Sequence, residues 1–339
     1  MRRAQISWPV AGAVLLLGAI SAVAQPAEKF FAGRTITLIV GFGPGGTYDY
    51  YARLVARHLG RHIPGNPTVV VQSMPGAGSL TAANYLYNVA PKDGTAMGTL
   101  SQTLAIEQAV KNPGARYDVA KFNWIGRATS VTQVQLTMAN SKIKTIEDAK
   151  TYETPVSHTG AGSPTLGYPK LLNGIVGTKF KFVGPYKGST NGLLAMERGE
   201  VESASTSYTT VLQKRPQWIF KKEANFLVQY ALKRIPELPN IPTFVELGKT
   251  AGDKQLMTLY VSGEEVGRSF LAPPGIPADR VAVLRKAFMA MIGDAETKAE
   301  AAKAKAELTP MSGRELQDFI TQTMKVPPAV VQRMQGLLK

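Results

Sequence analysis

Residues 35–59 read TITLIVGFGPGGTYDYYARLVARHL, and this stretch decides the fold. Residues 35–40 form a β-branched run of strand length, the glycines of residues 41–46 permit a tight turn, and the apolar residues that follow recur at helical spacing. The stretch therefore predicts a strand, a glycine turn and a helix. The same unit recurs in PTVVVQSMPGAGSLTAANYLYNVA (residues 67–90), where Ser79 is a candidate helix cap.

Strand and helix patterns continue to alternate along the chain. Residues 95–100 are typical of a third strand, and residues 104–110 (LAIEQAV) are typical of a helix. From about Ile125 a long extended stretch leads into a second set, in which residues 155–176 and 179–198 repeat the order strand, turn, helix. This alternation predicts an α/β fold with parallel strands, divided into two lobes.

The N-terminus has the pattern of a secretory signal peptide. Arg2 and Arg3 precede an apolar run at residues 10–20, and residues 22–24 have the A-x-A arrangement of a cleavage site. A membrane anchor is the alternative, but the run is shorter than the roughly 20 apolar residues of a spanning helix. We expect residues 1–24 to be removed and the mature chain to be a soluble periplasmic protein.

The composition excludes several classes of site. The chain has no cysteine, which excludes disulfides, thiolate metal sites and a cysteine nucleophile. Its formal net charge is +15, from 39 basic and 24 acidic residues, but the basic residues are spread along the chain as far as Lys339 instead of gathering on one element. We therefore expect no nucleic-acid partner, and a positive field that favours anionic solutes.

The turn at residues 41–46 formally matches the dinucleotide-binding pattern G-x-G-x-x-G. That interpretation needs an acidic residue about 20 positions further on, yet no acid lies between Asp49 and Asp93. Pro44 also removes one amide donor. We therefore expect no dinucleotide and no other cofactor.

Three glycine turns precede helices, at residues 43–47, 76–79 and 160–163. A glycine turn at a helix N-terminus exposes backbone N–H groups in the positive end of the helix dipole, which favours an anion. Each glycine alone is also explained by the needs of a tight turn. Three such turns in a secreted chain favour an anionic ligand in one cleft.

Candidates for catalysis are few. His58 and His62 have the i, i+4 spacing of metal ligands, but the segment HLGRH lacks the glutamate of H-E-x-x-H, and we interpret it as a solvated basic face without metal. His158 precedes a glycine turn, yet no G-x-S-x-G segment supplies a serine partner. An exported enzyme acting on a carboxylate, or a binding module for a membrane sensor, remains an alternative to a transport receptor.

The ordered motifs resemble one family. The stretches at residues 35–59 and 69–98, followed by HTGAGSPT, GPYKGS, LPNIPTFVELG and LAPPGIPADRVAVLRKAF, are similar to the substrate-binding receptors of tripartite tricarboxylate transporters, the TctC or Bug family. The resemblance covers nearly the whole mature chain. It implies a type II periplasmic-binding-protein fold, with two lobes that each contain a mainly parallel sheet flanked by helices and with a ligand cleft between them.

The resemblance also implies boundaries, a function and partners. We expect lobe 1 to comprise residues 25–127 and 259–339, and lobe 2 residues 128–258. The implied function is capture of a small di- or tricarboxylate or related organic acid by closure of the lobes, without catalysis. The implied partners are the permease subunits of a secondary transporter, and the protein itself is expected to be a monomer.

The implied ligand-binding residues follow the same motifs. First-lobe candidates are Phe42, Pro44, Gly45, Gly46, Thr47, Tyr48, Asp49, Pro75, Gly76, Ala77, Gly78, Ser101 and Gln102. Second-lobe candidates are Gly160, Ala161, Gly162, Ser163, Thr165, Tyr186, Lys187, Gly188, Ser205 and Thr206. Among them, Asp49 is expected to brace the first turn because like charges repel, and Lys187 to meet a distal carboxylate or remain in solvent. Ser205 and Thr206 stand where many members carry an aspartate, which argues against a ligand that needs a partner for an amino group.

Overall fold

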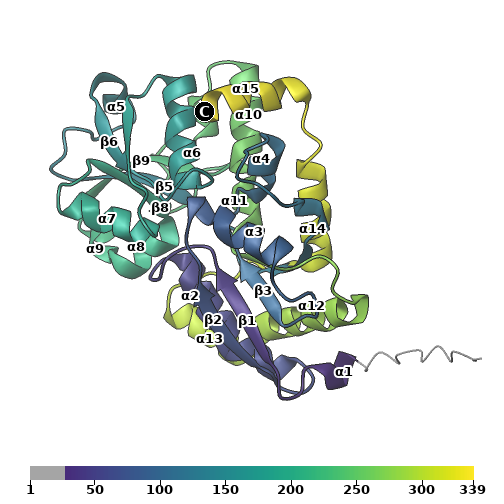
Figure 1. Ribbon diagram of the computed structural model, residues 1–339. Helices are drawn as coiled ribbons and strands as arrows, with labels where there is room; N and C mark the ends of the chain where they lie inside the picture. The colour runs from purple at the N-terminus through teal and green to yellow at the C-terminus, as the bar shows by residue number, and fades with distance from the viewer. Residues whose placement is uncertain (1–26) are drawn as a thin grey trace, which may run out of the picture.

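The computed structural model describes residues 27–339, so the predicted signal peptide lies outside the described residues. The chain forms two sheets, each flanked by helices (Figure 1). The first sheet has the strand order β11 (Met311–Ser312), β4 (Asn123–Arg127), β10 (Ser269–Ala272), β3 (Ala96–Thr99), β1 (Thr35–Val40), β2 (Thr68–Ser73). The second sheet has the order β7 (Phe180–Val183), β6 (Thr154–Ser157), β8 (Ser203–Ser207), β5 (Gln133–Met138), β9 (Ala224–Tyr230).

Helices cover both faces of the first sheet. One face carries α1 (Ala27–Phe30), α2 (Thr47–His58), α12 (Ala278–Gly293) and α13 (Ala295–Lys303), and the other carries α3 (Leu80–Asn88), α4 (Leu104–Ala109) and α14 (Gly313–Thr323). On β1, Leu38 and Val40 pack in the core on the side of α2 and α12, whereas Ile39 packs in the core on the side of α3 and α14. Because successive strand residues point to opposite faces, a strand segment buried on both faces is apolar at consecutive positions, as residues 38–40 (LIV) are.

The second sheet is covered in the same way. One face carries α5 (Asp148–Thr151), α6 (Pro164–Leu171), α10 (Ala251–Val261) and α15 (Pro328–Leu338), and the other carries α7 (Ser189–Glu197), α8 (Tyr208–Lys214) and α9 (Pro216–Phe220). Helix α15 packs against α6 and α10 of the second sheet. The strands that precede it in the sequence, β10 and β11, belong to the first sheet. No helix of the described residues is long and apolar enough to cross a membrane.

Parallel and antiparallel pairings occur in both sheets. Strand β1 pairs in parallel with β2 and β3, and β6 pairs in parallel with β7 and β8, as the repeated strand, turn, helix units predicted. Strands β10 and β5 pair antiparallel with their neighbours. Both of these strands receive the chain after it has crossed from the other sheet.

The two crossings between the sheets run side by side. The chain passes from β4 to β5 through residues 128–132, and it returns to β10 through α11 (Gly263–Val266) and Arg268. Arg268 exchanges two backbone hydrogen bonds with this first crossing, one to Thr129 O at 2.9 Å and one from Ala128 N at 2.9 Å. Gly267 has φ 55°, and a Cβ on it would lie 2.1 Å from Thr129 O, so the close approach requires glycine. The residue boundaries expected for the lobes stay a prediction.

The role expected for Ser79 was wrong. Ser79 has φ 85°, and its side chain makes no capping hydrogen bond to α3. Its hydroxyl instead accepts a hydrogen bond from Ser101 N at 3.1 Å. An N-cap residue normally has an extended backbone, which the left-handed conformation of Ser79 does not provide.

Candidate functional site

A cavity lies where the two lobes meet. Its volume is about 40 Å³, and its walls come from both lobes and from the crossing segment that carries Arg268. The lining residues are Phe42, Gly43, Gly46, Thr47, Tyr48, Gln102, Gln133, Thr159, Pro164, Thr165, Gly188, Ser189, Ser207 and Arg268.

Three helices begin at this cavity. Thr47 is the first residue of α2, Thr165 is the second residue of α6, and Ser189 is the first residue of α7. Residues 164 and 189 follow strands β6 and β7 of the second sheet, while α2 follows β1 of the first. The first N–H groups of a helix have no partner within the helix and carry partial positive charge, so three helix starts around one cavity favour an anion.

Arg268 contributes a full positive charge to the cavity. Its side chain is 3% exposed and its guanidinium stacks on the ring of Tyr48 at 3.9 Å. Nε donates to Thr47 Oγ1 at 2.9 Å and Nη1 donates to Gln102 Oε1 at 2.6 Å. The stacking and two hydrogen bonds hold the guanidinium in one orientation.

The charge of Arg268 has no direct counter-ion within residues 27–339, because none of their ion pairs includes this side chain. The neighbouring buried carboxyl is Glu264, whose Oε1 accepts from Tyr168 Oη at 2.7 Å and from Gln133 Nε2 at 3.1 Å. Burial raises the pKa of Glu264 to about 7. A buried cation that lacks a paired anion is costly, which favours an anionic ligand beside it.

Gln102 links Arg268 to the buried carboxyl of Glu264. Its Oε1 accepts hydrogen bonds from Tyr48 Oη at 2.9 Å and from Arg268. Within the described part of the chain, the buried Nε2 of Gln102 has no hydrogen-bond partner. Because Oε1 is fixed by two donors, the amide group is held in one orientation, with its N–H side toward the buried carboxyl of Glu264, where the interaction lowers the pKa of Glu264.

Direct contacts join the two lobes around the cavity. Gly43 N donates to Lys187 O at 2.8 Å, and the hydroxyls of Thr47 and Ser207 lie 3.2 Å apart. Thr103 Oγ1 donates to Gly162 O at 2.8 Å. The structure therefore has the cleft closed, and most of these contacts involve a backbone group of at least one lobe.

The second glycine turn, Pro75–Gly78, does not line the cavity. It lies against the second-lobe turn instead, where Gly162 N donates to Ala77 O at 3.2 Å. A Cβ on Gly78 would lie 2.3 Å from Ser163 N, and one on Gly160 would lie 2.6 Å from Gly78 N. These glycines therefore allow two backbones to approach each other across the lobes.

Asp49 and Lys187 lie outside the cavity lining. Asp49 accepts from Gly45 N at 3.1 Å and from Arg53 Nε at 2.8 Å, which is the bracing contact expected for it. The side chain of Lys187 is exposed, and its contact with the first lobe is made by its backbone oxygen. Tyr186 packs against the helices of the second lobe, at its α7 and α8 face.

The sequence located part of the lining. Of the predicted residues, the cavity brings together Phe42, Gly46, Thr47, Tyr48, Gln102, Thr165 and Gly188. The predicted residues outside the lining are Pro44, Gly45, Asp49, Pro75, Gly76, Ala77, Gly78, Ser101, Gly160, Ala161, Gly162, Ser163, Tyr186, Lys187, Ser205 and Thr206. Lining residues absent from the predicted ligand-binding set are Gly43, Gln133, Thr159, Pro164, Ser189, Ser207 and Arg268. A helix start after GPYK was a usable signal for Ser189, whereas no local pattern marks Arg268.

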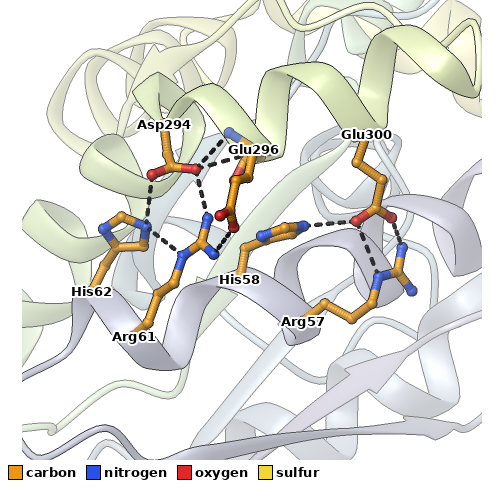
Figure 2. Close-up of polar contacts among 8 residues, drawn as sticks. Arg57, His58, Arg61, His62, Asp294, Glu296 and Glu300 are labelled. Carbon is orange, nitrogen blue, oxygen red and sulfur yellow. Dashed lines mark hydrogen bonds and ion pairs between the residues drawn. The ribbon is translucent and has the colours of Figure 1, made fainter.

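The paired histidines lie in a polar cluster between α2 and α13 (Figure 2). His58 Nε2 lies 2.7 Å from Glu300 Oε2, and Arg57 pairs with the same carboxylate. His62 Nε2 lies 3.9 Å from Asp294. The interpretation of His58 as part of a solvated face was wrong, since His58 is 8% exposed. Among residues 27–339, no group of three or more His, Asp or Glu side chains is placed to hold a metal ion.

His158 lies outside the cavity lining. Its Nδ1 accepts a hydrogen bond from Gly160 N at 3.2 Å, and burial lowers the pKa of its ring. A Cβ on Gly184 would lie 3.2 Å from its Nε2. These contacts give His158 a structural place in the second-lobe turn.

Comparison with known sequences identifies one family. Residues 51–336 match the family described as tripartite tricarboxylate transporter family receptor. A UPF0065 protein of Cupriavidus necator is 25% identical over 97% of this chain and 96% of its own length. A UPF0065 protein of Bordetella pertussis is 29% identical over 82% of this chain and 80% of its own length.

Comparison with solved structures identifies the fold. The periplasmic binding protein BugD aligns with a TM-score of 0.72 at 20% identity, covering 91% of this chain and 98% of BugD. MatC of Rhodopseudomonas palustris with bound malate aligns with a TM-score of 0.72 at 21% identity, covering 91% of this chain and 100% of MatC. A second R. palustris protein, solved with adipate, aligns with a TM-score of 0.69 at 22% identity, covering 90% and 98% of the two chains. The shared fold is that of two-lobed periplasmic binding proteins.

Proposed function

The chain belongs to the tripartite tricarboxylate transporter receptor family, and we propose that it captures a small carboxylate in the periplasm and delivers it to a membrane transporter of that type. The ligand is held between the two lobes and released unchanged. The protein acts as a monomer and needs no cofactor.

One observation carries the proposal. Arg268 is buried at a cavity between the lobes, lacks a carboxylate partner among the described residues, and shares the cavity with the starts of three helices. A carboxylate placed there receives charge-assisted hydrogen bonds from Arg268 and from backbone N–H groups. The malate and adipate bound by two aligned proteins support the same class of ligand.

Closure of the lobes supplies the signal to the transporter. A ligand that contacts Thr47 and Arg268 on one side and Ser189 on the other stabilises the closed state by its difference in affinity for the two states. The permease subunits then distinguish the closed surface from the open one. In this proposal the contacts of Gly43 with Lys187 form on closure and report that the site is filled.

The proposed binding residues combine the residues predicted from the sequence with those that line the cavity. Those that touch the ligand are the lining residues of the cavity, with Arg268 as the main side-chain donor. The predicted residues outside the lining, such as those at residues 75–78 and 160–163, support closure through contacts between lobes. Export requires the signal peptide at residues 1–24, and N-terminal sequencing of the periplasmic protein tests that cleavage.

A thermal-shift screen tests the function. The purified protein is heated with mono-, di- and tricarboxylates, amino acids, sugars and NAD, because a ligand specific for the folded state raises the melting temperature. We expect stabilisation by a class of carboxylates. A Gly46→Phe variant serves as control, since a bulky side chain at this lining position fills the cavity and removes the response. Stabilisation by NAD or by a sugar, without a carboxylate response, contradicts the proposal.

A further inference from the structure

We propose that Arg268 sets the ligand class of the site: it binds the one carboxylate of a short ligand that carries a single negative charge. This inference rests on the proposed carboxylate-binding function and narrows it. The residue is a specificity determinant because its fixed guanidinium is the charged group that the ligand meets in the cavity.

The orientation of the guanidinium leaves one end available. Nε and Nη1 are occupied by Thr47 Oγ1 and Gln102 Oε1, and the ring of Tyr48 covers one face. Among the hydrogen bonds of residues 27–339, none uses Nη2 of Arg268 or Nε2 of Gln102. Both side chains line the cavity. A carboxylate there can accept from Nη2 of Arg268 without any rearrangement of the protein, whereas the buried Nε2 of Gln102 lies beside the Glu264 carboxyl.

The charges around the cavity favour one carboxylate. Within the described chain, Arg268 is the charged side chain of the lining, and the other lining residues are glycine, proline, hydroxyl, amide or aromatic residues. Lys187, which the sequence offered for a distal carboxylate, is exposed and lies outside the lining. A second carboxylate on the ligand would therefore be desolvated without a cation of its own, and helix starts supply partial charges only.

Glu264 reinforces this balance. Its side chain is 4% exposed and is held behind the cavity by Tyr168 and Gln133, of which Gln133 lines the cavity. The nearby carboxyl already offsets part of the Arg268 charge when it is ionised. The charge that remains for the ligand is at most one unit.

The volume of the closed cavity favours a short ligand. About 40 Å³ is available, and a single water occupies on the order of 10–15 Å³ by the same measure. The cavity therefore takes a carboxylate with a few further heavy atoms. Thr47, Ser189 and Ser207 line the cavity, and their hydroxyls already bond to Arg268, Thr206, Thr210 or one another. A hydroxyl both donates and accepts, so these side chains suit a hydroxyl or oxo group beside the carboxylate.

Calorimetric titration with matched ligands tests the inference. Lactate and malate differ by one carboxylate in place of a hydrogen, and so do propionate and succinate. With the protein dialysed free of bound ligand, we expect lactate to bind at least tenfold more tightly than malate, and propionate at least tenfold more tightly than succinate. Adipate is the probe for a longer dicarboxylate.

Variants assign the selectivity to Arg268. Arg268→Met should weaken lactate binding by about 10- to 100-fold, the range expected for a lost charge-assisted hydrogen bond. Arg268→Lys keeps the charge but loses the planar fork, and should bind with intermediate affinity. Arg198→Met is the matched control, because the Arg198 side chain is 62% exposed and should leave binding unchanged.

The possible failures are distinguishable. Tighter binding of malate or adipate than of the matched monocarboxylates overturns the inference and leaves the proposed function standing. Wild-type lactate affinity in Arg268→Met also overturns it. Absence of binding by every carboxylate contradicts the proposed function itself. If Arg268→Met does not fold, the ligand pairs on the wild-type protein and the Arg268→Lys variant decide the question.

Discussion

Replacing Gly43 by alanine should weaken ligand binding by opposing closure of the lobes. A Cβ on Gly43 would lie 2.9 Å from Lys187 O and 3.2 Å from Lys187 Cβ, whereas ordinary contact begins at 3.4 Å. The two loops must therefore separate by roughly 0.5 Å, which lengthens the hydrogen bond from Gly43 N to Lys187 O, now 2.8 Å. The lobes themselves need not change, because the clash lies between them.

The expected loss of affinity follows from the weakened hydrogen bond and from the steric contact of the added methyl group. A weakened hydrogen bond costs about 0.5–1.5 kcal/mol, and the added methyl group about 1 kcal/mol or more in a packed contact. Together they disfavour the closed state by roughly 2 kcal/mol, which corresponds to about 30-fold weaker binding if the ligand requires closure. The melting temperature of the protein measured without ligand should change little.

The assay is calorimetric titration with the carboxylate that gives the largest thermal shift. Gly293→Ala is the matched control, because a Cβ there has no atom within 4 Å. Equal affinity of Gly43→Ala, Gly293→Ala and the wild type would refute the reasoning that binding requires this contact between the lobes.

Three further predictions concern stability and are measured by urea unfolding. Gly267→Ala should lower the free energy of unfolding by at least ~2 kcal/mol, because φ is 55° and the Cβ would lie 2.1 Å from Thr129 O; Gly199→Ala, with φ 74° and no atom within 4 Å, should cost less. Burial raises the pKa of Glu107 to about 7 from 4.5, so folding favours its protonated form. The stability that this contributes, up to about 3 kcal/mol, is present below pH 4.5 and is lost as the pH rises through 7. Glu107→Gln should therefore lose less stability than the wild type between pH 5 and pH 8, and an equal loss would contradict this. Glu300→Ala should cost about 1 kcal/mol of stability at pH 7, since Arg57 and the buried His58 lose their shared carboxylate (Figure 2). The hydrogen bond from Arg57 lowers the pKa of Glu300, so the stability contributed by Glu300 should fade as the pH drops below 4.5. A stability difference between variant and wild type that persists in acid would argue against the ion pairs.

Local patterns predicted the units of the fold. Residues 35–40 and 47–58 form the strand β1 and the helix α2 because the strand run, the glycine turn and the helical spacing lie next to one another in the sequence. Ser79 was mispredicted as a cap because tertiary contacts fix its backbone. A Cβ on Gly41 would meet its hydroxyl at 1.8 Å, and Ser101 N donates to the same atom.

Long-range contacts account for the rest of the site. Arg268 reaches Thr47 and Gln102, which lie 221 and 166 residues away in the sequence. No periodicity or motif reports such a meeting, because it depends on the return of the chain beside its first crossing. The two turns at residues 75–78 and 160–163 were found as glycine turns, yet their role in bringing two backbones together needed the structure.

The most direct test of the account is a high-resolution crystal structure of the protein with its best carboxylate ligand. We expect the ligand in the cavity between the lobes, with one carboxylate within hydrogen-bond distance of Nη2 of Arg268, and with Gly43 N still bonded to Lys187 O. Ligand density outside this cavity, or a carboxylate turned away from Arg268, would contradict it.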